Sequence, residues 1–255
     1  MRIAILSDIH GNTIALDAVL ADVERQGGVD GCWILGDFVA LGHDPIGVLE
    51  RISLLPGLVC TRGNTDRYLA TEERPFPAIG DAQSDPSLVT RIVEMNASFA
   101  WTQGAVTAAG WMDWLANLPL EFRTSLPDGT RFLGVHAAPG RDDDPGLYPT
   151  TTEADIDAAL KSSDADLICV GHTHEAMDVW VNGRHLINLG SVSNPKAPDL
   201  RASYVLLTAN NHGYKAQHHY VEYDRQAVLT ALETIRHPGR VFLSQFMRGE
   251  IQSQK

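Results

Sequence analysis

The chain has 255 residues, of which 44% are hydrophobic and 20% are charged, so it can bury one large core and we expect a single domain over residues 1–255. Its 20 Lys and Arg against 32 Asp and Glu give a net charge of −12, which argues against strong nucleic-acid binding through backbone phosphates. No apolar run approaches the roughly 18 residues of a membrane span. The amino terminus reaches a polar cluster too soon for a signal peptide, so the sequence predicts a cytoplasmic protein.

Three cysteines are the next constraint. Cys32, Cys60 and Cys169 lie in apolar, strand-like runs, are odd in number and lack the spacing of a zinc site. The sequence therefore predicts buried free thiols.

The first 61 residues alternate between short apolar runs and longer runs with helical spacing. Strands are predicted at 3–6, 32–35 and 58–61, and helices at 13–26 and 45–52. This βαβαβ order favours a mainly parallel sheet with right-handed crossovers.

Residues from about 66 to 114 break that order. A loop rich in Pro, Gly and Asp leads into two helical runs that carry Trp101, Trp111 and Trp114. We interpret this segment as a helical insertion that overhangs the site. The helical spacing predicts that the three indoles pack in the core, with stacking on a base or aryl group as the alternative.

The second half is richer in strands. They are predicted at 131–135, 167–170, 177–181, 185–188, 203–207 and 214–223, with helices at 153–161 and from Asp224 onward. The turn between Asn210 and Gly213 indicates a hairpin, and the polar tail from Gly249 to Lys255 is expected to be loose. Two face-to-face sheets with helices outside fit this order.

Metal-binding residue types occur in five short clusters, most of them directly after an apolar run. Open α/β sheets bind ligands beyond the carboxyl ends of their strands, so we expect these clusters to meet. One cluster alone has an ordinary explanation as a turn, a helix cap or a core histidine. Five together favour a metal site made of Asp8, His10, Asp37, Asn64, His136, His172 and His174.

The ligand types limit the metal. Asp8 and His10 are separated by one residue, as are His172 and His174, so in an extended segment each pair projects to one side. Carboxylate with imidazole suits Mn, Fe, Zn or Ni better than Ca or Mg. Asp37 is the candidate bridge between two cations roughly 3.5–4 Å apart.

In this order and spacing the clusters resemble those of the calcineurin-like metallophosphoesterase superfamily, over residues 3 to about 206. The opening from Asp8 to Asn12 is similar to diadenosine tetraphosphatase and protein phosphatase relatives, and the segment from Asn188 to Val192 is similar to a small bacterial and archaeal phosphodiesterase branch. The resemblance implies an α/β fold, a four-layer αββα sandwich of two mixed sheets. It also implies one ion held by Asp8, His10, Asp37 and His174, and a second held by Asp37, Asn64, His136 and His172.

The resemblance implies hydrolysis of phosphodiester bonds by a metal-bridging hydroxide, with Asp37, Asn64 and His136 as catalytic residues. The implied cofactors are two divalent transition-metal ions, with manganese the first choice and Fe, Zn or Ni as alternatives. Other activities stay open: dinucleoside polyphosphate hydrolase, protein phosphatase, or a non-catalytic metal-binding scaffold of the same fold. Whether the insertion forms a closed pocket or an open groove would discriminate among substrates.

Thr65 departs from the family pattern, in which histidine follows the asparagine and protonates the leaving oxygen. A threonine hydroxyl is far too weak an acid for that role, which is typically worth about 10²–10⁴-fold in rate. We therefore expect a preference for substrates with good leaving groups.

The partner is expected to be a small phosphorylated substrate, and a homodimer stays open. Candidate substrate contacts are Asn12, Arg62 and Arg141. Asn12 is alternatively the cap of the helix at Thr13, and the two arginines are alternatively solvated. Asp66 is a candidate acceptor for a metal-bound imidazole.

Overall fold

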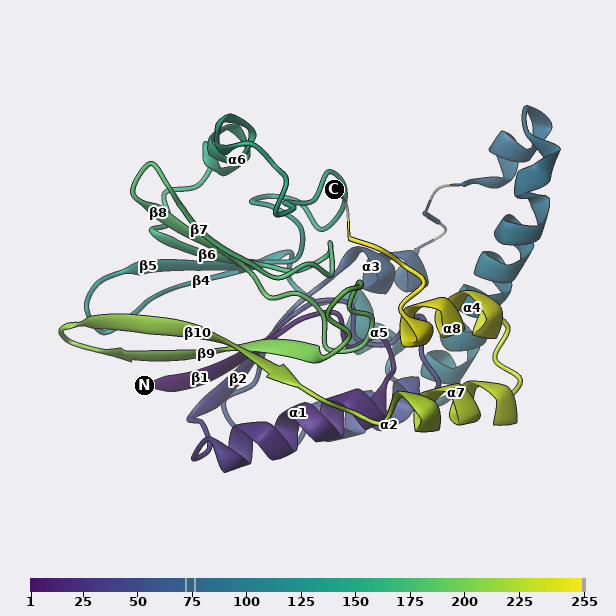
Figure 1. Cartoon of the computed structure of the whole chain (residues 1–255), viewed down its shortest axis with the longest axis horizontal. Coiled ribbons are helices and arrows are strands. Elements are labelled where there is room, and N and C mark those ends of the chain that lie inside the picture. The colour runs from purple at the N-terminus through teal and green to yellow at the C-terminus, as the bar shows by residue number, and fades with distance from the viewer. Residues whose placement is uncertain (72, 76, 254–255) are drawn as a thin grey trace.

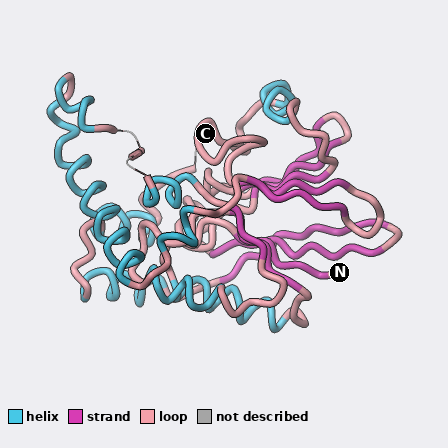
Figure 2. Tube along the Cα trace, turned by 180° about the vertical axis from the view of Figure 1, so that it is seen from behind, coloured by secondary structure: helices cyan, strands magenta, loops and turns pink. Residues whose placement is uncertain are grey.

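The computed structural model describes residues 1–71, 73–75 and 77–253. Two five-stranded sheets lie face to face with helices on both outer faces (Figures 1 and 2), as the four-layer α/β prediction requires. The first sheet has the order β10-β9-β1-β2-β3. Its strands are β1 (Arg2–Leu6), β2 (Gly31–Leu35), β3 (Val59–Thr61), β9 (Ala202–Asn210) and β10 (Gly213–Val221).

The first sheet confirms the predicted βαβαβ start. Strands β1, β2 and β3 are parallel and are connected by α1 (Thr13–Arg25) and α2 (Pro45–Ile52). The predicted hairpin then adds β9 antiparallel to β1, with Asn210 opposite Gly213 at the turn. The sheet is therefore mixed, and α1 and α2 cover its outer face (Figure 1).

The second sheet has the order β4-β5-β6-β8-β7, with β4 (Glu121–Ser125), β5 (Arg131–Val135), β6 (Leu167–Val170), β7 (Met177–Val181) and β8 (Arg184–Asn188). Strands β5, β6 and β8 are parallel, while β4 and β7 are antiparallel edges. The helix α6 (Glu153–Leu160) lies on the outer face (Figure 1). The sequence does not predict β4, because this edge strand has no buried residue to produce a strong apolar pattern.

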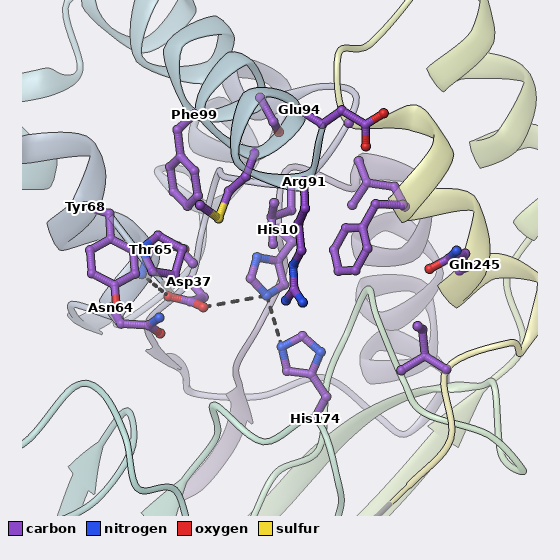
Figure 3. A pocket seen from close by; sticks show the side chains of 18 of the residues that line it. His10, Asp37, Asn64, Thr65, Tyr68, Arg91, Glu94, Phe99, His174 and Gln245 are labelled. Carbon is purple, nitrogen blue, oxygen red and sulfur yellow. Dashed lines mark hydrogen bonds and ion pairs between the residues drawn. The ribbon is translucent and has the colours of Figure 1, made fainter. Parts of the chain in front are cut away.

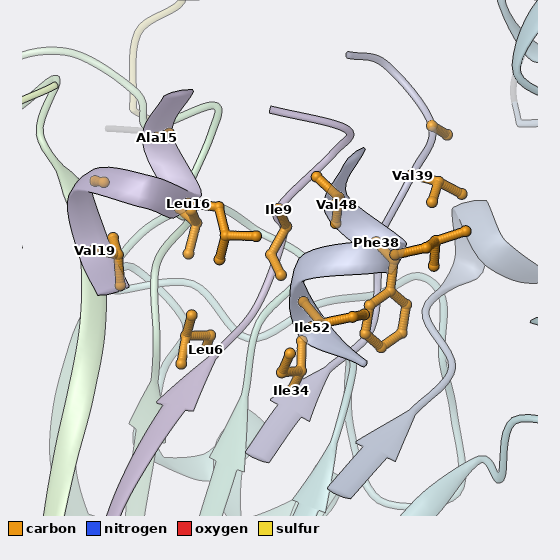
Figure 4. Packing of buried hydrophobic residues seen from close by; sticks show 14 of the residues in the cluster. Leu6, Ile9, Ala15, Leu16, Val19, Ile34, Phe38, Val39, Val48 and Ile52 are labelled. Carbon is orange, nitrogen blue, oxygen red and sulfur yellow. The ribbon is translucent and has the colours of Figure 1, made fainter. Parts of the chain in front are cut away.

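β1 shows how the core fixes the strand ends. Ile5 and Phe132 belong to the cluster between the two sheets, while Leu6 belongs to the cluster under α1 and α2, with Leu16 and Ile34 (Figure 4). Because successive side chains of a strand point to opposite faces, a strand buried on both sides is apolar throughout. The first polar residues after it therefore mark its end.

The 66–114 segment contains α3 (Asn64–Ala70), η1 (Ile79–Gln83), η2 (Pro86–Leu88), α4 (Val89–Ala108) and α5 (Met112–Ala116). In Figure 1 the start of α4 extends away from the two sheets. The rings of Trp111 and Trp114 are 5.8 Å apart, and Trp114 lies 5.5 Å from Phe38 in the core. Trp101 lies 4.8 Å from His237. Core packing is therefore confirmed for Trp111 and Trp114, which lie against the core cluster, whereas Trp101 is half-buried and belongs to none of the core clusters.

The carboxyl-terminal part forms α7 (Arg225–Thr234), where the sequence predicts a helix, and then a second helix, α8 (Arg240–Arg248). The tail expected to be loose is tied down as far as Ser253. Ala197 donates to the carbonyl of Ile251 at 2.9 Å, and Ser253 donates to the carbonyl of Ala197 at 3.2 Å. Residues 254–255, the end of that predicted tail, lie outside the described residues.

All three cysteines are free; Cys32 and Cys169 are buried as predicted, and Cys60 is half-buried. Within the described part of the chain, every helix is too short or too polar to cross a bilayer.

Candidate metal centre

The predicted ligands meet where loops leave the carboxyl ends of β1, β2, β3, β5 and β6. Main-chain hydrogen bonds connect these loops directly. Asp8 donates to the carbonyl of Gly36 at 3.2 Å, and Gly171 donates to the carbonyl of His136 at 2.8 Å. Segments distant in sequence are thus held at one edge of the two sheets.

Left-handed backbone conformations bring the side chains inward. Asp8, His10, Asp37, His172 and His174 have φ between 48° and 69°, and they are five of the eight non-glycine residues with positive φ in the described chain. The pairs separated by one residue therefore converge through tight turns, and the extended geometry expected from the sequence is wrong. Such strained conformations persist where the surrounding structure enforces them, commonly at functional sites.

Two glycines allow the loops to approach each other. A Cβ on Gly63 would lie 2.0 Å from Asp37 Oδ1, and a Cβ on Gly36 would lie 2.6 Å from Gly63 Cα. A larger residue at position 63 would displace Asp37, and one at position 36 would displace Gly63 and His136. The glycines before Asp37 and Asn64 are therefore a steric requirement of the site.

The first ligand set surrounds Asp8. Its Oδ1 atom lies 3.1 Å from His174 Nε2 and 3.7 Å from His10 Nε2. His10 Nε2 also lies 3.6 Å from Asp37 Oδ2 (Figure 3). Ligands that share one ion at bonds of about 2.0–2.2 Å are separated by about 3.0–3.5 Å, so these atoms are close to a ligand arrangement.

The second set lies on the other side of Asp37. His136 Nε2 is 3.4 Å from Asp37 Oδ2 and 3.1 Å from Asn64 Oδ1. His172 Nδ1 is also 3.1 Å from Asn64 Oδ1. Asp37 thus contacts both sets, as the sequence predicts for a bridging carboxylate.

The main chain sets the tautomers of three imidazoles. The Nδ1 atoms of His10, His136 and His174 lie 3.0, 2.7 and 2.8 Å from the carbonyls of Ala40, Leu35 and Asn194. A carbonyl only accepts, so each Nδ1 carries a hydrogen, and in the neutral ring each Nε2 lone pair faces the site.

His172 is oriented differently, because its Nε2 lies 3.1 Å from Asp144 Oδ1. The sequence proposed Asp66 for this kind of contact, and that assignment is wrong. Both oxygens of Asp66 accept main-chain N–H groups, from Asp37 at 2.8 Å, Phe38 at 3.1 Å and Gly63 at 2.9 Å. Asp66 therefore holds the loops that carry the ligands.

Charge at the centre is concentrated and buried. Burial opposes ionisation of Asp37, but the neighbouring His136 and His10 imidazoles hold the pKa of its carboxyl far below the usual range. Burial likewise lowers the pKa of His136, but Asp37 and Asp8 outweigh it and raise the pKa to about 10. Asp8 Oδ1 is buried and accepts no hydrogen bond from any described residue. Imidazole nitrogens that point inward and buried carboxylates together form a site that suits bound cations.

Thr65 is buried at the entrance of α3. Its main-chain N–H donates to Asp37 Oδ1 at 3.0 Å, while its Oγ1 atom makes no hydrogen bond within the described residues. The backbone of this residue positions the carboxylate, and its hydroxyl is available next to the pocket described below.

The predicted substrate contacts lie elsewhere. Asn12 Oδ1 accepts from the N–H of Ala15 at 3.0 Å, which is the capping role given as its alternative. Arg62 Nε donates to Asp142 Oδ2 at 2.6 Å. Neither these two residues nor Arg141 lines the pocket beside the metal ligands.

That pocket has a volume of about 660 Å³, within the range of small-molecule sites. One wall contains His10, Asp37, Asn64, His172 and His174. The opposite wall comes from α4 and α8 (Figure 3) and includes Arg91, Glu94, Met95, Phe99, Phe242 and Leu243. The sequence does not predict this wall, because a helical pattern does not show which distant site the helix faces.

Known proteins resemble this chain along nearly its whole length. It is 27% identical over 239 residues to the Methanocaldococcus jannaschii protein MJ0912, covering 87% of this chain and 88% of that one. The crystal structure of a metallophosphoesterase from Sphaerobacter thermophilus has a TM-score of 0.76 at 24% identity, with 98% and 99% of the two chains covered. The hypothetical protein PH1004 from Pyrococcus horikoshii has a TM-score of 0.78 at 20% identity, with 100% and 99% covered.

These structures share the fold. The model of the calcineurin-like phosphoesterase superfamily domain matches residues 1–212, which include all seven predicted ligands. The chain belongs to the calcineurin-like phosphoesterase superfamily.

Proposed function

We propose that this protein is a metal-dependent phosphodiesterase with two divalent ions, held by the two ligand sets that meet at Asp37. The observation that carries the proposal is the convergence of inward acceptors on Asp37: His10 Nε2 at 3.6 Å on one side and His136 Nε2 at 3.4 Å on the other. Two divalent ions would supply positive charge that lowers the pKa of a water molecule and neutralises phosphate oxygens.

Residues of the chain itself hold the proposed metal ligands in position. The carbonyl contacts of Ala40, Leu35 and Asn194 keep three imidazoles aimed at the site, so little reorganisation is needed on binding. Asn64 Oδ1 lies between His136 and His172. Five of the seven proposed ligands line the pocket, namely His10, Asp37, Asn64, His172 and His174, so a phosphate group of a small substrate would reach them from there.

Thr65 limits the leaving group. It lines the pocket beside Asp37 and Asn64, where a proton donor would otherwise stand, and its hydroxyl cannot act as a general acid near neutral pH. We therefore assign aryl-type phosphodiesters, whose leaving groups need no protonation, as better substrates than alkyl monoesters.

The donor set of imidazoles, carboxylates and one amide oxygen suits a first-row transition metal. Manganese is our first choice, and Fe, Zn and Ni are the alternatives. Affinity alone does not choose among these ions, so the metal is best identified by activity after reconstitution.

The test is reconstitution of metal-free protein separately with Mn, Ni, Fe and Zn, followed by assay with bis(p-nitrophenyl) phosphate and p-nitrophenyl phosphate. We expect metal-dependent cleavage of the diester, lost in Asp37→Asn and retained in the control Asp164→Asn, an exposed carboxylate in surface ion pairs. Absence of turnover with every ion, despite two ions bound, would reject the phosphodiesterase and favour a scaffold of the same fold.

A further inference from the structure

The pocket beside the metal ligands has two walls of different chemistry. The ligand wall is polar and buried, as described above. The facing wall is mostly apolar and combines Met95 and Phe99 of α4 with Phe242 and Leu243 of α8, near Ile251 of the tail. A substrate made only of phosphate would need no such wall, so its apolar surface requires a separate explanation.

Two segments outside the sheets build this wall. α4 belongs to the 66–114 segment and α8 lies near the carboxyl terminus, yet both line the same pocket (Figure 3). Phe242 is 39% exposed, and its ring meets that of Phe246 edge-on at 5.4 Å. An aromatic side chain that is partly exposed at a pocket gains by covering an apolar ligand group.

Arg91 adds a positive charge to this wall. It is the only Arg or Lys among the described residues that line the pocket. Its side chain extends from α4 toward His10 and His174 in Figure 3. Within residues 1–71, 73–75 and 77–253, no carboxylate or carbonyl engages its guanidinium, whereas Arg62 and Arg67 are both paired with Asp142. A guanidinium placed this way matches the oxygens of a phosphate.

We propose that this pocket selects phosphate esters that carry an aromatic group. The ring would lie against Phe242 and Met95, through aromatic and sulfur contacts, while Arg91 pairs with a phosphate oxygen at the ligand wall. The inference rests on the proposed phosphodiesterase function and names its substrate class. The ring can be a simple aryl group or a nucleobase, since both present the same flat apolar surface.

Binding of two phosphonates tests this without turnover, because their carbon–phosphorus bond is not an ester. Methylphosphonate and phenylphosphonate would be titrated calorimetrically into the manganese-loaded protein. We expect phenylphosphonate to bind at least about tenfold more tightly, from the apolar area of one buried ring. Equal affinities would overturn the proposal.

Substitutions test which residues produce the preference for phenylphosphonate. Phe242→Ala and Phe242→Leu should each reduce the phenyl preference to about threefold or less, and two variants guard against a folding defect in one. Arg91→Gln should weaken both phosphonates by about tenfold and leave their ratio unchanged. Ile235→Ala, which alters a residue of similar exposure, 40%, that does not line the pocket, is the matched control and should change neither. A phenyl preference that survives both Phe242 changes would overturn the assigned ring position.

Two further comparisons show whether the ring belongs to a nucleobase or to an aryl ester, and which of the two proposals fails. Tighter binding of thymidine 5′-monophosphate than of ribose 5-phosphate would assign the ring to a nucleobase, and a gain confined to phenylphosphonate would assign it to an aryl ester. Diester turnover without any phenyl preference would defeat this inference alone. A phenyl preference without turnover would defeat the proposed function and leave the pocket assignment standing.

Discussion

His10 Nε2 and His174 Nε2 lie 3.1 Å apart, although the other nitrogen of each ring is already committed to a main-chain carbonyl. In the tautomers that those carbonyls impose, two lone pairs face one another beside Asp8. This contact is favourable only with a positive charge between the rings, either a proton or a metal ion. The local sequence, with left-handed turns at both histidines, thus holds an arrangement suited to a cation.

Metal binding should release protons. Asp37 and Asp8 raise the pKa of His136 to about 10 against the cost of burial, so this imidazole carries a proton at pH 7 in the metal-free protein. A histidine must be neutral to bind a metal ion, so binding displaces that proton and metal affinity should rise from pH 6 to pH 8.

Calorimetry at pH 7 in buffers of different ionisation enthalpy measures this release. About one proton should leave per protein when both sites fill. The release should diminish in His136→Gln. Heats that do not depend on the buffer would contradict the assigned protonation of His136.

Asp144 should support metal binding without being a ligand in either set. Its carboxylate is 78% exposed and lies 3.1 Å from His172 Nε2, where it orients the ring. We expect Asp144→Asn to weaken metal affinity by about tenfold, at the lower end of the effect of such supporting contacts. Equilibrium titration with manganese measures it, with Asp164→Asn as the control. An unchanged affinity would show that the ring is held by its other contacts.

Restoring histidine at position 65 should broaden the substrate range. Thr65→His would add a general acid, and we expect turnover of alkyl phosphodiesters to increase by up to about 10²–10⁴-fold with little change for bis(p-nitrophenyl) phosphate. Thr65→Val, which keeps the main-chain contact to Asp37, is the control. Equal responses of the alkyl and aryl substrates to Thr65→His would show that leaving-group protonation does not limit turnover.

His237 should make the protein sensitive to acid. It is fully buried, its Nδ1 accepts from the N–H of Gly239 at 3.1 Å, and burial, with His43 and Arg240 nearby, lowers its pKa to about 4. The unfolded chain binds this proton near pH 6.5 and the folded chain does not. The free energy of unfolding should therefore fall as the pH decreases from 6.5 to 4.

Urea unfolding of the metal-free protein at pH 7, 6 and 5 tests this. The loss of stability should be smaller in His237→Phe, which keeps an aromatic ring against Trp101, and unchanged in His212→Asn, which alters an exposed turn. An identical pH dependence in the wild type and His237→Phe would exclude His237 as the titrating group.

The sequence predicted most accurately the features of the fold and site that depend on a single segment of the chain. β1 and β2 are buried on both faces, so their apolar runs and the polar residues after them fixed both the strands and the ligand positions. The edge strand β4 has no such run. The role of Asp66 and the position of α4 and α8 opposite the metal ligands depend on contacts between distant segments, which the periodicity of a single segment does not show.

The positions of the metal ions decide whether Asp37 bridges a two-metal centre. A crystal of manganese-loaded protein, measured at the manganese absorption edge, should show two anomalous peaks, one on each side of Asp37 and roughly 3.5–4 Å apart. A single peak, or a peak displaced from Asp37 onto Asp143, Asp144 and His172, would contradict a two-metal centre bridged by Asp37.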